Sequence, residues 1–64
     1  MLEHYRCYFI SRDGKARSLA TILAHDAMEA VNTAVRRYPL KAYRFVEVWQ
    51  RCDRVLTCEN PSAA

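Results

Sequence analysis

A single segment with helical character divides this 64-residue chain into two strand-rich parts. In "HDAMEAV", Asp26 stands where a helix N-cap is expected, and Glu29 completes a capping box three residues later. The apolar stripe that follows has helical spacing and ends before Pro39: Ala27, Val31, Ala34 and Tyr38. We therefore expect one helix over residues 26–38, packed on one face of a sheet.

An Asp-Gly pair marks a hairpin ahead of this helix. Residues 4–11, "HYRCYFIS", are rich in aromatic and β-favouring residues, and "ARSLATILA" at 16–24 returns as a second strand. Asp13 and Gly14 are expected to supply the positive φ angles of a two-residue turn. Such a turn pairs Phe9 with Ser18 and Cys7 with Ala20.

This pairing sorts the side chains of the hairpin onto two faces. One face has small residues that a helix can approach closely, and we expect it in the core: Tyr5, Cys7, Phe9, Ala16, Ala20, Ile22 and Ala24. The other mixes charge with large apolar groups: His4, Arg6, Tyr8, Ile10, Arg17, Leu19, Thr21 and Leu23. We expect the second face to stay uncovered.

The stretch "YRFVEVWQR", residues 43–51, carries apolar side chains on both faces of a third strand. Val46 and Val48 point to one face and are expected under the helix, whereas Tyr43, Phe45 and Trp49 point to the other. "RCD" then forms a turn and "RVLTCE" a short fourth strand, and residues 60–64 are expected to be a disordered tail.

The order hairpin, helix, hairpin predicts an α+β fold in a single ββαββ domain over residues 1–59, with a four-stranded antiparallel sheet. The strand order is 2-1-3-4 if the third strand lies antiparallel to the first; in the alternative order, 1-2-3-4, strands two and three are a parallel pair. In both, apolar side chains meet on the uncovered face: Tyr8, Ile10, Leu19, Leu23, Tyr43, Phe45 and Trp49. Such a patch, where Glu47 can pair with Arg6, is typical of an interaction site.

Size, charge and cysteine content narrow the class of protein. A chain this short buries only about 60% of the surface that it exposes when unfolded, so self-association is one expected source of added stability. Its start carries charges where a secretory signal needs an apolar run, and no segment approaches the ~20 apolar residues of a membrane span. We expect a cytoplasmic protein whose three cysteines are thiols.

Sites for metal or catalysis find little support in the residue spacing. His4, Cys7, Cys52 and Cys58 are zinc-type ligands, but the chain has no C-x-x-C pair, and positions 4 and 7 point to opposite faces of one strand. No base is placed beside a cysteine, so neither an enzyme nor a cofactor is predicted. Cys58, near a strand end, is the thiol that we expect to pair between chains.

Ten Lys and Arg against seven Asp and Glu give a net charge of +3. In the 2-1-3-4 order, the first turn, the end of the helix and the start of the third strand lie toward one pole. This basic pole contains Arg12, Lys15, Arg17, Arg36, Arg37 and Lys41. It would attract phosphates, although a solvated, solubilising surface is the preferred interpretation, and Arg36 and Arg37 also suit the helix dipole.

The layout resembles the very short hairpin-helix-hairpin proteins of bacteria and the small phage-borne anti-CRISPR proteins. The stretches that carry this resemblance are "YRCYFISRDGKA", "HDAMEAV" and "VEVWQRCDRVL". It implies stoichiometric binding to a CRISPR effector complex, without catalysis or cofactor, and it assigns no functional residues. The basic charge differs from that of a DNA mimic and favours contact with an acidic protein surface or near a phosphate channel.

Three hypotheses of function follow. The leading one is a non-enzymatic interaction protein that inhibits a nucleic-acid-handling complex through the basic pole and the aromatic sheet face. The second is a direct DNA- or RNA-binding module, since Tyr43-Arg44-Phe45 and Tyr5-Arg6 interleave aromatic and cationic side chains. The third is a structural homodimer.

Overall fold

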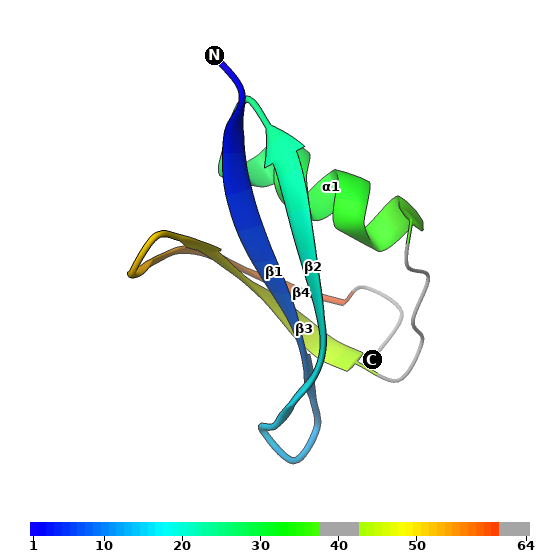
Figure 1. Ribbon diagram of the computed structural model, residues 1–64. Helices are drawn as coiled ribbons and strands as arrows, with labels where there is room; N and C mark the ends of the chain where they lie inside the picture. Colours follow the sequence, from blue (N-terminus) through cyan, green and yellow to red (C-terminus); the bar gives the residue numbers. More distant parts are fainter. Residues whose placement is uncertain (38–42, 61–64) are drawn as a thin grey trace.

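The arrangement of strands around one helix confirms the predicted ββαββ layout. The computed structural model describes residues 1–37 and 43–60. Its elements are β1 (Glu3–Ser11), β2 (Ala16–Ala24), α1 (Ala27–Arg37), β3 (Tyr43–Gln50) and β4 (Asp53–Glu59). The antiparallel sheet has the order β2-β1-β3-β4, with α1 on one face (Figure 1). The alternative order with a parallel pair is thereby excluded.

The first hairpin turn differs in detail from the prediction. The amide of Gly14 donates to the Ser11 carbonyl at 2.9 Å, and the amide of Ser11 donates to the Lys15 carbonyl at 2.9 Å, so the loop has three residues. Gly14 has a φ of 80°, whereas Asp13 does not have a positive φ. The predicted register holds from Glu3 to Phe9, and a bulge then pairs Ile10 with Ala16. Ala16 therefore lies on the uncovered face, and its predicted core position is wrong.

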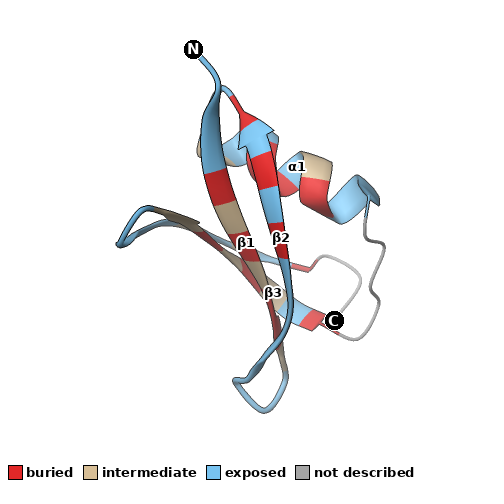
Figure 2. Ribbon diagram, in the orientation of Figure 1, coloured by how far each residue is buried: buried red, intermediate tan, exposed pale blue. Residues whose placement is uncertain are grey.

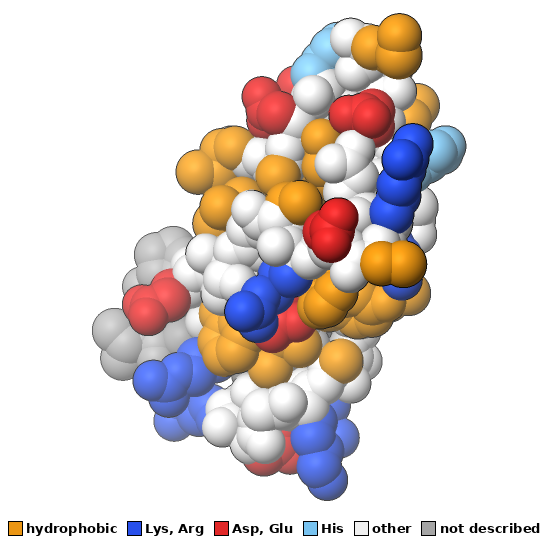
Figure 3. Space-filling model, turned by 90° about the vertical axis from the view of Figure 1, so that its left-hand side faces the viewer, with side chains coloured by type: hydrophobic (Ala, Val, Ile, Leu, Met, Phe, Trp, Pro, Cys, Tyr) orange, Lys and Arg blue, Asp and Glu red, His pale blue; other side chains and the backbone are white. Residues whose placement is uncertain are grey.

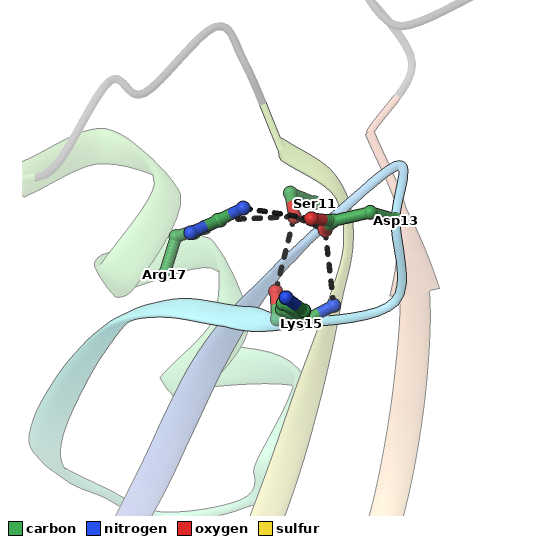
Figure 4. Close-up of polar contacts among 4 residues, drawn as sticks. All are labelled: Ser11, Asp13, Lys15 and Arg17. Atoms are coloured by element: carbon green, nitrogen blue, oxygen red, sulfur yellow. Dashed lines mark hydrogen bonds and ion pairs between the residues drawn. The ribbon is translucent and has the colours of Figure 1, made fainter.

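Asp13 organises this turn through its side chain (Figure 4). Its carboxylate accepts hydrogen bonds from the Ser11 hydroxyl, from the Lys15 amide at 3.2 Å and from Arg17 Nη2 at 2.7 Å. The Ser11 hydroxyl, together with the Lys15 amide and the Arg17 guanidinium, lowers the pKa of Asp13. The bond to the Lys15 amide pairs a backbone group of the turn, because an Asp side chain reaches the backbone two residues ahead.

The predicted Asp26 cap of α1 is confirmed, whereas the Glu29 side chain bonds the amide one residue before the one that a capping box uses. The Glu29 amide donates to Asp26 Oδ1 at 2.8 Å. The Glu29 carboxylate accepts a hydrogen bond from the His25 amide at 3.4 Å, and its Oε1 lies 3.2 Å from the ring Nδ1 of His25. Ala30, Val31 and Ala34 are buried against the sheet. Tyr38 and Pro39, the predicted end of the helix, lie outside the described residues.

One core fills the space between α1 and the sheet, where buried and exposed residues alternate along the strands (Figure 2). The buried set is Tyr5, Cys7, Phe9, Ala20, Ile22, Ala24, Ala30, Val31, Ala34, Tyr43, Val46 and Val48. Small alanines on both layers let α1 approach closely, and Cys7 Sγ lies 3.9 Å from the Ala30 carbonyl. The predicted core positions of Val46 and Val48 are confirmed.

Tyr43 belongs to this core, so its predicted place on the uncovered face is wrong. A bulge pairs Ile10 with Phe45 and Ser11 with Tyr43, which leaves Arg44 as an extra residue. The extra residue reverses the alternation and turns Tyr43 toward α1. Its ring packs edge-on against Phe9 with centroids 5.1 Å apart, and burial raises its pKa.

Asn60 follows β4 and is still hydrogen-bonded to β3, although the disordered tail was predicted to start at this residue. Its amide donates to the Arg44 carbonyl at 2.8 Å, and its side-chain Nδ2 donates to the Tyr43 carbonyl at 2.9 Å. Asn60 is buried, so the prediction of a tail from residue 60 is wrong at that residue. Residues 61–64 lie outside the described part of the chain.

Neighbouring positions on β3 should respond oppositely to the same substitution. Val48 is fully buried, so we expect Val48→Ser to leave a cavity and a buried hydroxyl and to cost about 2 to 4 kcal/mol. Trp49→Ser should cost clearly less, because Trp49 lies outside the α1-packed core. Thermal and urea unfolding, followed by circular dichroism, measure both variants. A silent Val48→Ser beside an unfolded Trp49→Ser would show that the two faces are reversed.

Candidate interaction surface

The face of the sheet turned away from α1 presents six half-buried or buried side chains from the two central strands. The register pairs Arg6 with Trp49, Tyr8 with Glu47 and Ile10 with Phe45. We call this surface the open face; it also includes Ala16, Leu19, Thr21 and Leu23 of β2 and Arg54 and Thr57 of β4. Figure 3 shows hydrophobic side chains over this side of the molecule, with charged side chains between and around them.

Arg6 is held in one position by three contacts. Its guanidinium carbon lies 5.8 Å from the centroid of the Tyr8 ring, and Nη1 donates to the Tyr8 hydroxyl at 3.2 Å. Nη2 donates to the carbonyl of Arg51 in the β3–β4 turn. Arg51 has a φ of 58°, in the left-handed region that non-glycine residues seldom adopt. The cation on the open face is therefore fixed by both an aromatic ring and a turn.

Glu47 is the acidic counterpart in the middle of the open face. Its Oε1 accepts a hydrogen bond from the Trp49 indole nitrogen at 3.2 Å, and its Oε2 lies 3.5 Å from Arg54 Nη1. The predicted pairing with Arg6 is wrong. A bulge at Val48/Trp49 pairs Trp49 with Arg54 and so brings this arginine to the open face.

These contacts frame a shallow depression with a volume of about 250 Å³. Its lining residues are Arg6, Tyr8, Ile10, Ala16, Glu47 and Trp49. Ile10 is only 6% exposed although no helix covers it, so the aromatic side chains around it exclude water. The depression therefore offers an apolar centre with one fixed cation and one fixed carboxylate beside it.

Most of the predicted partner-binding residues lie on the open face. Tyr8, Phe45 and Trp49 are half-buried, whereas Leu19 and Leu23 on β2 are 54% and 51% exposed. Tyr43 is the exception. Arg54 and the Arg51 carbonyl were not predicted as part of this surface, because both depend on the β3–β4 turn and its bulge, which leave no clear pattern in the sequence.

The predicted basic pole is divided in the structure. Arg12, Lys15 and Arg17 lie at the β1–β2 turn, and Arg36 and Arg37 lie at the end of α1, a separate part of the molecule in Figure 1. Arg17 pairs with the Asp13 carboxylate. Lys41 lies outside the described residues. The basic side chains that are described therefore do not form one continuous site.

The three cysteines occupy different environments. Cys7 is buried, Cys52 is exposed on the β3–β4 turn, and Cys58 is half-buried against the core. The most accessible thiol is thus Cys52, not the predicted Cys58. Among residues 1–37 and 43–60, no three His, Cys, Asp or Glu side chains are grouped so as to hold a metal ion.

Comparison of this chain with known proteins identifies no matching family model, no similar curated protein and no similar solved structure. Within residues 1–37 and 43–60, no helix has the length and apolar character needed to cross a membrane.

Thiol modification should follow exposure. We expect an alkylating reagent to modify Cys52 first, Cys58 more slowly and Cys7 only on unfolding. Disulfide-linked dimers formed in air should disappear in Cys52→Ser and persist in Cys58→Ser. Mass mapping after timed alkylation and non-reducing gels measure these two effects. Faster modification of Cys58 than of Cys52 would contradict the burial described for β4.

Alkaline pH should destabilise the protein through Cys7. Burial raises the pKa of the Cys7 thiol to about 11, whereas a thiol in the unfolded chain ionises near 9.0. Its contribution to stability is complete below pH 9 and is lost as pH rises through 11, because the unfolded chain then binds fewer protons. Urea unfolding of wild type and Cys7→Ala between pH 8 and about 11 measures this loss. An equal pH dependence in Cys7→Ala would exclude Cys7 as its source.

Proposed function

We propose that this protein is a non-enzymatic interaction protein that binds a protein partner through its open face. The observation that carries the proposal is the depression around Ile10, in which Arg6 and Trp49 are held by hydrogen bonds. The few side chains that dominate binding energy in protein interfaces are enriched in Trp, Tyr and Arg, and fixed side chains lose little entropy on binding. Tyr8, Trp49 and Arg6 provide this combination on one surface.

The charges of the open face favour a protein over a nucleic acid. Glu47 places a carboxylate at the centre of the surface, where it would repel a phosphate backbone. The cations of the β1–β2 turn are partly offset by Asp13, and those of α1 lie elsewhere. A partner with an apolar projection flanked by both acidic and basic side chains fits the depression best.

The resemblance to small anti-CRISPR proteins supports a CRISPR effector complex as the first partner class to examine. In this form of the proposal, the protein is a stoichiometric inhibitor of a nucleic-acid-handling complex. Its net charge of +3 suits an acidic protein surface. Inhibition then comes from occupying a surface that the complex needs, with no chemical step on this chain.

Substitution of Trp49 should weaken partner binding without unfolding the protein. Purified effector complexes and partners captured from the native host would be titrated with wild type, Trp49→Ser and Met28→Ser. Met28 is 53% exposed on α1, so Met28→Ser is a matched control on the other side of the sheet. We expect Trp49→Ser to weaken binding about 30-fold or more and Met28→Ser to have little effect.

Equal binding by Trp49→Ser and wild type would exclude the open face as the binding site. A salt titration with a short DNA or RNA oligonucleotide examines the alternative function. Phosphate contacts would appear as affinity that falls steeply with salt concentration. If the oligonucleotide binds strongly, with an affinity that falls with salt and that Trp49→Ser reduces, the partner of the open face is a nucleic acid and not a protein.

A further inference from the structure

Strand β2 forms an edge of the sheet without the usual protection against pairing. The order β2-β1-β3-β4 leaves one side of β2 unpaired within the described residues. The charge and the bulge of β2 are confined to its start, at Arg17, and from Ser18 to Ala24 this strand has no charged residue, proline or glycine. The opposite edge, β4, carries charges at both ends and a bulge between them. Natural edge strands usually carry charges, prolines or bulges that prevent pairing, so a long uncharged edge is a template for another strand.

The exposed side chains of β2 are symmetric about Thr21. Leu19 and Leu23 flank it at equal spacing on the open face, and both are about half exposed. If two β2 strands pair antiparallel with Thr21 opposite Thr21, each Leu19 lies opposite Leu23 of the second copy. The same register places Ala20 opposite Ile22 on the α1 side. Apolar cross-strand pairs of this kind stabilise a sheet.

The charges at the two ends of β2 favour the same orientation. Arg12, Lys15 and Arg17 against Asp13 leave the start of β2 net basic, whereas Asp26 and Glu29 follow its end. Antiparallel pairing brings the basic end of each strand toward the acidic end of the other. A parallel arrangement would instead place like charges together at both ends.

We propose that two copies of this chain associate through their β2 edges, antiparallel about Thr21, and form one continuous sheet with four strands from each copy. Both α1 helices then lie on one side and both open faces on the other, as the two-fold axis perpendicular to the sheet requires. Leu19 and Leu23 of each copy then contact those of the other copy, in the region of the sheet between the two depressions. This association does not depend on which partner binds the open face.

Charge substitutions at the symmetry position provide the test. Thr21 is exposed, so Thr21→Lys and Thr21→Glu should each fold, which circular dichroism checks. Each variant alone would place like charges opposite each other and should raise the dimer dissociation constant about 100-fold or more. An equimolar mixture should recover dimers, because lysine then faces glutamate. Sedimentation equilibrium over a concentration series, in the presence of reductant, measures all of these species.

Two controls make the result specific. Thr57→Lys introduces the same charge on the open face at the opposite edge and should leave dimerisation unchanged. Trp49→Ser should also still dimerise, so failure of this proposal and failure of the proposed function are distinguishable. Reduced exchange of β2 amide hydrogens with rising wild-type concentration is a second readout that needs no substitution.

A monomeric wild type at every concentration would overturn the proposal. Dimers of wild-type affinity in both Thr21 variants would show that the interface lies elsewhere. Failure of the mixture to recover dimers would overturn the pairing about Thr21.

Discussion

One helix can cover only one face of a four-stranded sheet, and the rest of this structure depends on that limit. The covered face holds the core, with Cys7 and Val48 fully buried beneath α1. The other face must limit the exposure of its own apolar groups, and it does so with amphipathic side chains from β1 and β3. Ile10 is buried there without a covering helix, beside Tyr8 and Trp49. The same limit therefore produces both the core and the open face.

Local signals in the sequence predicted the layout because each has a short-range physical cause. The Asp26 cap and the Asp-Gly turn act within a few residues; the cap sets where α1 begins, and the turn sets where the chain reverses between β1 and β2. The alternation of Val46 and Val48 identified the core side of β3 because the side chains of a strand alternate between its faces. Topology reduced the strand order to two alternatives, and the structure has the order β2-β1-β3-β4.

The errors in assigning residues to faces have one physical source, because β-bulges reverse the alternation from which the faces were assigned. The extra residue Arg44 moved Tyr43 into the core, and the bulge beside Phe9 moved Ala16 onto the open face. A third bulge, on β4, brought Arg54 to the open face, where it pairs with Glu47 in place of the expected Arg6. Bulge positions depend on how two strands meet, so neither strand's sequence reveals them by itself. The position of the open face likewise depends on how strands meet, and local sequence patterns specify no partner for it.

The turn between β3 and β4 links the fold to the proposed binding surface. Arg51 adopts a left-handed backbone conformation, which costs a non-glycine residue about 1 kcal/mol or more. Its carbonyl accepts the hydrogen bond from Arg6 that also holds this side chain against Tyr8. The backbone of the turn and the side chains of the open face are thus coupled, and a partner meets a surface that is already arranged. If two such surfaces lie side by side in one continuous sheet, a partner that spans both gains affinity without any new contact within either copy.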